Sequence, residues 1–340
     1  MTSMERVISA LNLQEVDRTP VIPQLTYAAA YFIQMGIDEA LEDSEKQKMA
    51  LLNAQRIAGY DGIYAGWEGS FVLVTSSLGA PLKIYKDKPP STEKALITSK
   101  EDLEKLPKLD PSSQGRIPLN LQLIKNLKLE VKDLPILSYI PSPFTLGSLF
   151  LGLTDFMIAL MKDRLNILED LFRYTYEATL LFAKAKIQQG VDMITIADPS
   201  GSSDMVSPKL FEQRSLPLLK ELITELKKDD IKVGLHICGQ TKPILSKMAE
   251  TGADYLEIDA KVNLVEAKKL LGGKICLVGN ISSTDLVMKS PPEIKEKCND
   301  LIRRMGTGFI LSSGCEVAYS TSLENIKAMV KSSKEMGNQS

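Results

Sequence analysis

The sequence predicts an α/β protein whose fold is a (β/α)8 TIM barrel. Three observations support this prediction: eight short apolar segments have the length of buried strands, helical patterns separate them, and polar side chains follow most of them directly. Alternating strands and helices are typical of a parallel sheet, and eight strands favour a closed barrel over a doubly wound open sheet. The 340 residues fit, because such barrels commonly take about 250 residues and more with insertions.

The strands are expected where short apolar runs end in turn-forming or polar residues. They comprise residues 19–24, 62–65, 135–140, 192–197, 233–237, 255–258, 274–278 and 308–311. A helix over residues 3–13 precedes the first strand and forms an N-terminal helical extension of the barrel. Further helices are expected at residues 43–59, 119–127, 165–189 and 208–228, whereas residues 141–147 are predicted to form turns.

Residues 83–116 differ from the rest of the chain. Lysine and aspartate alternate there with Pro89 and Pro90, and a short helical pattern at residues 99–106 ends before Pro107. This composition predicts a surface excursion from the barrel and not a second domain. We therefore expect a single barrel domain over residues 1–340.

The composition disfavours several classes of function. A formal net charge of −2 gives no electrostatic reason to expect nucleic acid or a membrane surface as a partner. The first residues lack the pattern of a signal peptide, and no apolar stretch approaches the roughly 20 residues of a membrane span, so a cytoplasmic protein is expected. There the four cysteines are expected to be free thiols or metal ligands. Of these, Cys276 and Cys298 lie in patterns typical of buried thiols.

In a (β/α)8 barrel the functional side chains follow the carboxyl ends of the strands. The residues at these positions are Gln24, Glu68, Ser142, Asp198, His236, Cys238, Asp259, Asn280 and Cys315. Two of them have an equally good structural explanation, because Asp198 precedes a proline and can form a turn, and Asn280 can cap the next helix.

His236 is the only histidine of the chain, and Cys238 follows it two positions later. This spacing places both side chains on one face of a strand, and Cys315 follows the last strand at the same end of the barrel. One imidazole and two thiolates match the ligands that Zn²⁺ prefers, and three protein ligands leave a position open for a substrate. The fifth and eighth strands are not neighbours, however, and the alternative is a buried histidine beside two unrelated thiols.

Further motifs are distributed over nearly the whole chain. They are Glu15-Val16-Asp17-Arg18-Thr19-Pro20-Val21, Ser77-Leu78-Gly79, Pro143-Phe144-Thr145-Leu146, Gly279-Asn280 and Ser312-Ser313-Gly314-Cys315. Together they resemble the uroporphyrinogen decarboxylase superfamily, whose fold is a (β/α)8 barrel. Within it, His236-Ile237-Cys238-Gly239 with Cys315 resembles the zinc-dependent corrinoid methyltransferases, which include the methylcobamide:coenzyme M methyltransferases.

The chain departs from the true decarboxylases at their substrate-binding positions. Those enzymes carry two arginines for substrate carboxylates just after the first strand, where this chain has Leu25 and Ala29. Their essential aspartate falls near Ser70 here, and their late histidine aligns with Cys315. A porphyrinogen with its many carboxylates would meet little positive charge, so decarboxylation is disfavoured.

The resemblance implies a zinc-containing methyltransferase. It would move a methyl group between methylcobalamin, a corrinoid held by a separate partner protein, and a small-molecule thiol such as coenzyme M. Zn²⁺ would be held by His236, Cys238 and Cys315, which are then also the catalytic residues. Ser142, Asp198 and Asn280 are expected to face the substrate or the corrinoid.

A second resemblance concerns the fourth zinc ligand. Cobalamin-independent methionine synthases place a carboxylate ligand after an Ala-Asp strand, and here Ala253-Asp254 leads to Asp259, which is therefore the expected fourth ligand. An equally good alternative is that Asp259 binds a substrate or caps a loop. Glu257 is expected on the opposite face of the strand.

Three other functions stay open at this point. Relatives of this kind also demethylate methoxylated aromatics or other methyl donors onto cob(I)alamin, with zinc acting as a Lewis acid. Uroporphyrinogen decarboxylation and a non-catalytic zinc-binding protein are less favoured, the latter because structural zinc sites are closed. The sequence also leaves open whether the chain forms a homo-oligomer.

Overall fold

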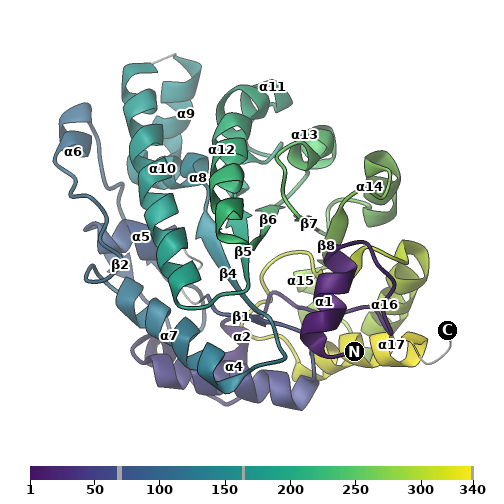
Figure 1. Ribbon diagram of the computed structural model, residues 1–340. Coiled ribbons are helices and arrows are strands. Elements are labelled where there is room, and N and C mark those ends of the chain that lie inside the picture. The colour runs from purple at the N-terminus through teal and green to yellow at the C-terminus, as the bar shows by residue number, and fades with distance from the viewer. Residues whose placement is uncertain (67–70, 163–164, 338–340) are drawn as a thin grey trace.

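The computed structural model describes residues 1–66, 71–162 and 165–337, and it shows a curled parallel sheet surrounded by helices (Figure 1). In the described residues, seven strands lie in the order β1-β4-β5-β6-β7-β8-β9, and all neighbouring pairs are parallel. They are Ile63–Tyr64 (β1), Ile136–Pro141 (β4), Met193–Ala197 (β5), Lys232–Ile237 (β6), Tyr255–Ile258 (β7), Cys276–Ile281 (β8) and Phe309–Ser313 (β9). Each overlaps a predicted strand, and the predicted fold class is confirmed.

The first predicted strand is present only as a short bridge that joins the two edges of the sheet. Val21 pairs in parallel with Leu311 of β9, and the Leu311 backbone makes two hydrogen bonds of 2.9 Å with this segment. On the other side, Asp61 N donates to Val21 O at 2.7 Å just before β1 begins. The strand stays short because Pro20 and Pro23 carry no amide hydrogen and interrupt the ladder on both sides of the bridge.

Helices cover the outside of the barrel, as predicted. They are Ser3–Leu11 (α1), Ala28–Tyr31 (α2), Ile37–Leu41 (α3), Ser44–Ala58 (α4), Phe71–Ser77 (α5), Lys100–Glu104 (α6), Ile117–Glu130 (α7), Pro143–Leu151 (α8), Leu153–Met161 (α9), Leu165–Gln188 (α10), Pro208–Leu210 (α11), Leu216–Leu226 (α12), Leu245–Ala249 (α13), Leu264–Leu271 (α14), Ser283–Met288 (α15), Pro291–Met305 (α16) and Leu323–Gly337 (α17). Short 3-10 turns occur at Pro199–Gly201, Lys227–Asp229 and Lys242–Ile244, and a π-helical turn at Phe211–Ser215 joins α11 to α12.

The prediction of turns at residues 141–147 is wrong, because α8 begins there. Pro143 occupies the first helical turn, where a missing amide hydrogen costs nothing, and Ser142 caps the helix by accepting a hydrogen bond from Thr145 N at 2.9 Å. Among the described helices, none is by itself long and apolar enough to cross a membrane. The α8–α9 pair reaches that length and composition together, but it is bent by 110°.

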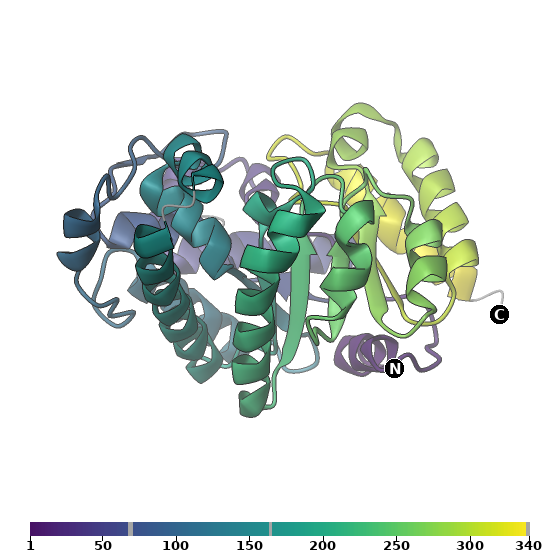
Figure 2. The ribbon, with the colours of Figure 1, turned by 90° about the horizontal axis from the view of Figure 1, so that it is seen from above.

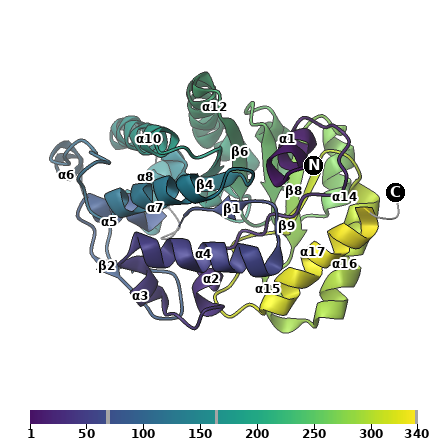
Figure 3. The same cartoon turned by 60° about the horizontal axis from the view of Figure 1, so that its bottom comes forward.

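Hydrophobic side chains form two cores. The larger one lies between the sheet and the surrounding helices. The smaller one fills the barrel interior with inward-facing residues such as Tyr64, Met193 and Tyr255, and α1 adds Val7 and Leu11 to it. Figure 3 shows α1 lying beside β8 and β9, so the N-terminal extension covers one end of the barrel.

The predicted surface excursion is confirmed. It contains the antiparallel pair of Leu82–Lys83 (β2) with Ser91–Thr92 (β3), followed by α6. Viewed from above, this dark blue segment lies at the edge of the molecule far from the C-terminal helices (Figure 2).

Candidate metal centre

His236 points from β6 into the barrel. It pairs with Ala197 of β5 and Glu257 of β7, and only 4% of it is exposed. Gly234 faces the same interior two positions earlier, and a Cβ there would lie 2.2 Å from the ring of Tyr255. The ring of Tyr255 therefore fills the barrel interior below His236, toward the amino ends of the strands.

The chain turns sharply after β6, and this turn places Cys238. Gly239 has a φ of 83°, in the left-handed region that glycine adopts without strain. A Cβ at Gly239 would lie 2.4 Å from Asp204 Oδ2, so the Asp204 side chain would have to move to admit a larger residue. Gly239 N donates to Asp259 Oδ2 at 2.8 Å, which fastens the turn to the end of β7.

Cys315 reaches the same place because the chain after β9 leans over its neighbours. Gly314 N donates to Ile281 O of β8 at 2.7 Å. A Cβ on Gly314 would lie 2.5 Å from Ala260 N, just beyond β7, so the backbones approach as closely as glycine allows. This close approach removes the objection that β6 and β9 are separated by two strands.

The three predicted ligands form one cluster. His236 Nε2 lies 2.9 Å from Cys238 Sγ, and Cys238 Sγ lies 3.4 Å from Cys315 Sγ. Tetrahedral zinc, about 2.3 Å from sulfur and about 2.0 Å from nitrogen, separates its ligands by roughly 3.5–3.8 Å. Small side-chain rotations therefore suffice, and a donor set of one imidazole and two thiols fits Zn²⁺.

The protons of this cluster are distributed unevenly. The hydrogen bond from Cys238, with the positive charge of His236, lowers the pKa of Cys315, and the same bond raises the pKa of Cys238. Burial lowers the pKa of His236, but the hydrogen bond to Cys315 and the charges of Cys315 and Glu257 outweigh it and raise the pKa to about 9. These shifts favour a thiolate at Cys315 beside a protonated His236, and metal binding would release protons from the cluster.

Asp259, the expected fourth ligand, is not brought into this cluster. Its Oδ2 accepts the hydrogen bond from Gly239 N, and its Oδ1 accepts one from Lys261 N at 2.8 Å. The carboxylate holds two backbone turns in place, which matches the alternative of a loop cap. Its role as a zinc ligand stays a prediction that this geometry does not support.

Ser142 and Asp198 lie close together, and their side chains are hydrogen-bonded to each other. Asp198 is fully buried and accepts hydrogen bonds from the hydroxyls of Ser142, Thr145 and Ser215. Burial raises the pKa of Asp198, and these hydrogen bonds oppose that shift. Both residues are thus engaged within the protein, and their contact with a substrate or corrinoid stays a prediction.

The side chain of Asn280 also forms hydrogen bonds within the protein. Its Nδ2 donates to Asp259 O at 3.0 Å and to Val262 O at 2.7 Å. Of the remaining strand-end residues, Gln24 is buried and its backbone N–H donates to Ser313 Oγ at 3.1 Å. Glu68 lies outside the described residues.

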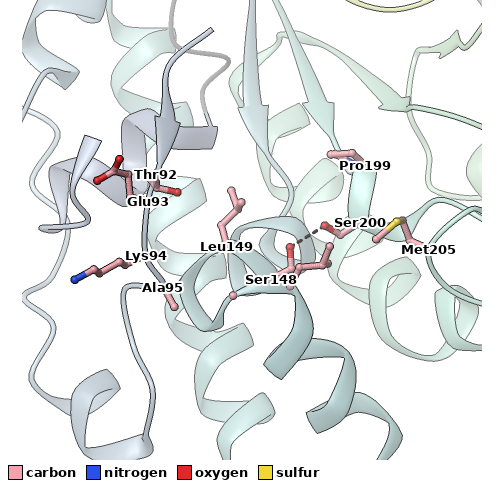
Figure 4. Close-up of a pocket in the computed structure, with 11 residues that line it drawn as sticks. Thr92, Glu93, Lys94, Ala95, Ser148, Leu149, Pro199, Ser200 and Met205 are labelled. Atoms are coloured by element: carbon pink, nitrogen blue, oxygen red, sulfur yellow. Dashed lines mark hydrogen bonds between the residues drawn. The ribbon is translucent and has the colours of Figure 1, made fainter. Parts of the chain in front are cut away.

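A cavity of about 420 Å³ lies beside α8 (Figure 4). Thr92 from the excursion, Ser148 from α8 and Ser200 from the loop after β5 contribute to its wall. Figure 4 shows the hydroxyls of Ser148 and Ser200 joined, at 2.7 Å. The cavity wall includes none of the three clustered ligands.

Glu257 is the site residue that the sequence prediction misplaced. It lies inside the barrel, not on the opposite face, because residues two apart in a strand share a face and it pairs with His236. Its Oε1 accepts from Tyr64 OH at 2.6 Å and Thr195 Oγ1 at 2.8 Å, and its Oε2 accepts from Tyr139 OH at 2.8 Å. Oε2 also lies 3.5 Å from His236 Nδ1. The sequence feature that could have identified Glu257 as a site residue is a glutamate within an otherwise apolar strand.

Comparison with curated proteins places the chain among methyltransferases and decarboxylases. It is 28% identical to "Methylcobamide:CoM methyltransferase MtbA" of Methanosarcina acetivorans over 342 residues, which cover 98% of each chain. It is 29% identical to "Methylcobamide:CoM methyltransferase MtaA" of Methanosarcina barkeri, again over 98% of each. The uroporphyrinogen decarboxylase of Trichodesmium erythraeum is 27% identical over 76% of this chain and 74% of that protein.

Solved structures agree with this placement. A methyltransferase from Methanosarcina mazei superposes with a TM-score of 0.90 at 28% identity, covering 99% of each chain. A putative vitamin-B12 independent methionine synthase from Listeria monocytogenes shares the fold, with a TM-score of 0.53 at 15% identity over 94% of this chain and 96% of that one. The profile of uroporphyrinogen decarboxylase (URO-D) matches residues 2–336. The chain therefore belongs to the uroporphyrinogen decarboxylase (URO-D) family.

Proposed function

We propose that this protein is a zinc-dependent methyltransferase that moves a methyl group from a protein-bound corrinoid to a small thiol, with coenzyme M as the first candidate. The observation that supports it most is the cluster of His236, Cys238 and Cys315 at the carboxyl ends of the barrel strands. The cluster occurs in a chain that is similar, over 98% of its length, to proteins named methylcobamide:CoM methyltransferases. A separate protein would supply the corrinoid.

The three residues of the cluster would bind zinc, and the zinc would favour the charged form of a substrate thiol. Zinc held by His236, Cys238 and Cys315 would lower the pKa of a substrate thiol, so that the thiolate is present near neutral pH. Tyr64, Tyr139 and Tyr255 pack in the barrel interior below the cluster, so we expect a substrate to approach from the carboxyl ends of the strands.

The proposed methyl transfer needs no reactant other than the thiol and methylcobalamin. The thiolate sulfur would attack the methyl carbon that methylcobalamin supplies, so that a sulfur–carbon bond forms as the cobalt–carbon bond breaks. Both electrons of the broken bond would stay on cobalt, and the products would be cob(I)alamin and the methylated thiol. The thiol proton is lost to solvent before the attack.

Two observations disfavour porphyrinogen decarboxylation, the activity of other family members. Leu25 and Ala29 stand where those enzymes carry substrate-binding arginines, and both are buried here, with 1% and 0% of their surfaces exposed. They offer neither charge nor access to a carboxylate.

The experiment supplies zinc-loaded protein with methylcob(III)alamin and one thiol at a time, coenzyme M or homocysteine, without oxygen. Visible absorbance follows the conversion to cob(I)alamin. We expect rapid demethylation with coenzyme M that stops when zinc is removed with a chelator. Failure of every thiol, together with methylation of cob(I)alamin by a methoxyarene, would overturn the proposed direction.

A further inference from the structure

We propose that Glu257 orients His236 for the metal, by accepting the Nδ1 proton and so fixing Nε2 as the nitrogen that binds zinc. This inference rests on the metal centre of the proposed function. Glu257 acts through the histidine and is therefore a positioning residue.

The geometry at the two imidazole nitrogens supports this assignment. Nε2 faces Cys238 Sγ at 2.9 Å, on the side of the thiols. Nδ1 is buried, has no hydrogen-bond partner among the described residues, and lies 3.5 Å from Glu257 Oε2. Such contacts are often long before the ligand binds and shorten in the complex. Because Glu257 sits at the nitrogen opposite the thiols, it is not placed to be a ligand of the same metal.

The carboxylate is held rigidly by its other partners. Tyr64 and Thr195 donate to Oε1, and Tyr139 donates to Oε2. The Thr195 hydroxyl also lies 2.8 Å from Tyr255 OH, so the network extends across the barrel. Glu257 itself has no exposed surface.

The contact with His236 explains why this buried position carries a negatively charged glutamate. A buried charge is costly unless it is paired, whereas a side chain that only gathers hydroxyls could be a neutral amide. A carboxylate behind a metal-bound histidine fixes the tautomer and the ring orientation, and losing such a partner typically costs 10–100-fold in metal affinity. Glu257→Gln separates these two roles, because it keeps the shape and removes the charge.

The first measurement is the zinc affinity of the purified protein by competition with a chromophoric chelator, with no corrinoid and no thiol present. We expect Glu257→Gln to bind zinc about 10–100-fold more weakly than the wild type. Asp198→Asn is the matched control, because Asp198 is also fully buried beneath three hydroxyl donors, and its contact with His236 is a hydrogen bond of 2.9 Å between backbone atoms that the substitution keeps. We expect its zinc affinity to equal that of the wild type.

The second measurement uses the fact that the chain has one histidine. Protein labelled with ¹⁵N-histidine gives a single set of imidazole signals, so the tautomer is identified without assignment. In the zinc-loaded wild type we expect a proton on Nδ1 and the metal on Nε2. This measurement needs no variant, and it decides the question if Glu257→Gln does not fold.

Three results would overturn the inference. They are an unchanged zinc affinity in Glu257→Gln, an equal loss in Glu257→Gln and Asp198→Asn, and a zinc-loaded wild type with its proton on Nε2. A wild type that binds no zinc would overturn this inference and the metal centre together. A wild type that binds zinc but transfers no methyl group would contradict only the proposed function.

Discussion

Replacing Asp61 by alanine is expected to loosen the closure of the barrel. Asp61 lies just before β1, is fully buried, and donates its backbone amide to Val21 O. Its carboxylate accepts hydrogen bonds of 2.7–2.9 Å from the guanidinium groups of Arg6 and Arg18 and from Val21 N. One side chain thus joins α1, the bridging segment at Val21 and the start of β1.

The expected loss follows from what each arginine retains. Arg6 keeps its pair with Asp17 at 2.6 Å, whereas Arg18, with 14% of its side chain exposed, keeps only a hydroxyl contact with Ser333 at 3.2 Å. Removing one partner of a buried ion pair costs about 3–5 kcal/mol. An unfolding entropy of about 2.1 cal/mol/K per residue gives about 0.7 kcal/mol/K for 340 residues, so the Tm should fall by roughly 4–7 °C.

The assay is denaturant unfolding together with a thermal scan of the wild type and Asp61→Ala. Glu39→Gln is the control, because Glu39 pairs with Lys46 on the surface and its loss should leave the Tm unchanged. A loss below about 1 kcal/mol in Asp61→Ala, the size of a surface ion pair, would refute the reasoning.

Three further predictions concern local packing, helix capping and pH. Gly234→Ala should lower the free energy of unfolding by about 1–3 kcal/mol, because its Cβ would lie 2.2 Å from the ring of Tyr255; a neutral result in denaturant unfolding would contradict this packing. Ser142→Ala should cost about 0.5–2 kcal/mol by removing the cap of α8, and no change in the unfolding midpoint would argue against the cap. Hydrogen bonds from Ser290 lower the pKa of Glu293 from 4.5 to about 2. The stability from Glu293 is therefore present above pH 4.5 and lost as the pH falls to about 2, so the wild type should lose more stability over this range than Glu293→Gln; parallel pH profiles would disprove the shift.

The parts of the fold that depend on local pattern were predictable. β7 was expected at residues 255–258 and occupies Tyr255–Ile258, because an apolar run of strand length ends at a polar residue there. The first strand was only partly predictable, since its pairing depends on Leu311 and Asp61, which are distant in the sequence. α8 was missed because proline and serine, which favour turns, also begin helices.

The site was predictable where the ligands share one strand. His236 and Cys238 are two positions apart, so their common face follows from strand geometry alone. The place of Cys315 depends on the close approach of Gly314 to Ala260, and the orientation of Asp259 depends on two backbone amides. Neither can be derived from periodicity, because both are set by loops that meet only in the folded chain.

The central claim is that His236, Cys238 and Cys315 form a zinc centre, and its most direct test is the zinc content of purified protein by mass spectrometry. We expect one zinc per chain in the wild type and in Cys298→Ala, whose thiol is buried in α16 away from the cluster. We expect almost none in Cys238→Ala and Cys315→Ala, provided that both remain folded by circular dichroism. Full zinc content in folded Cys238→Ala and Cys315→Ala would contradict the claim.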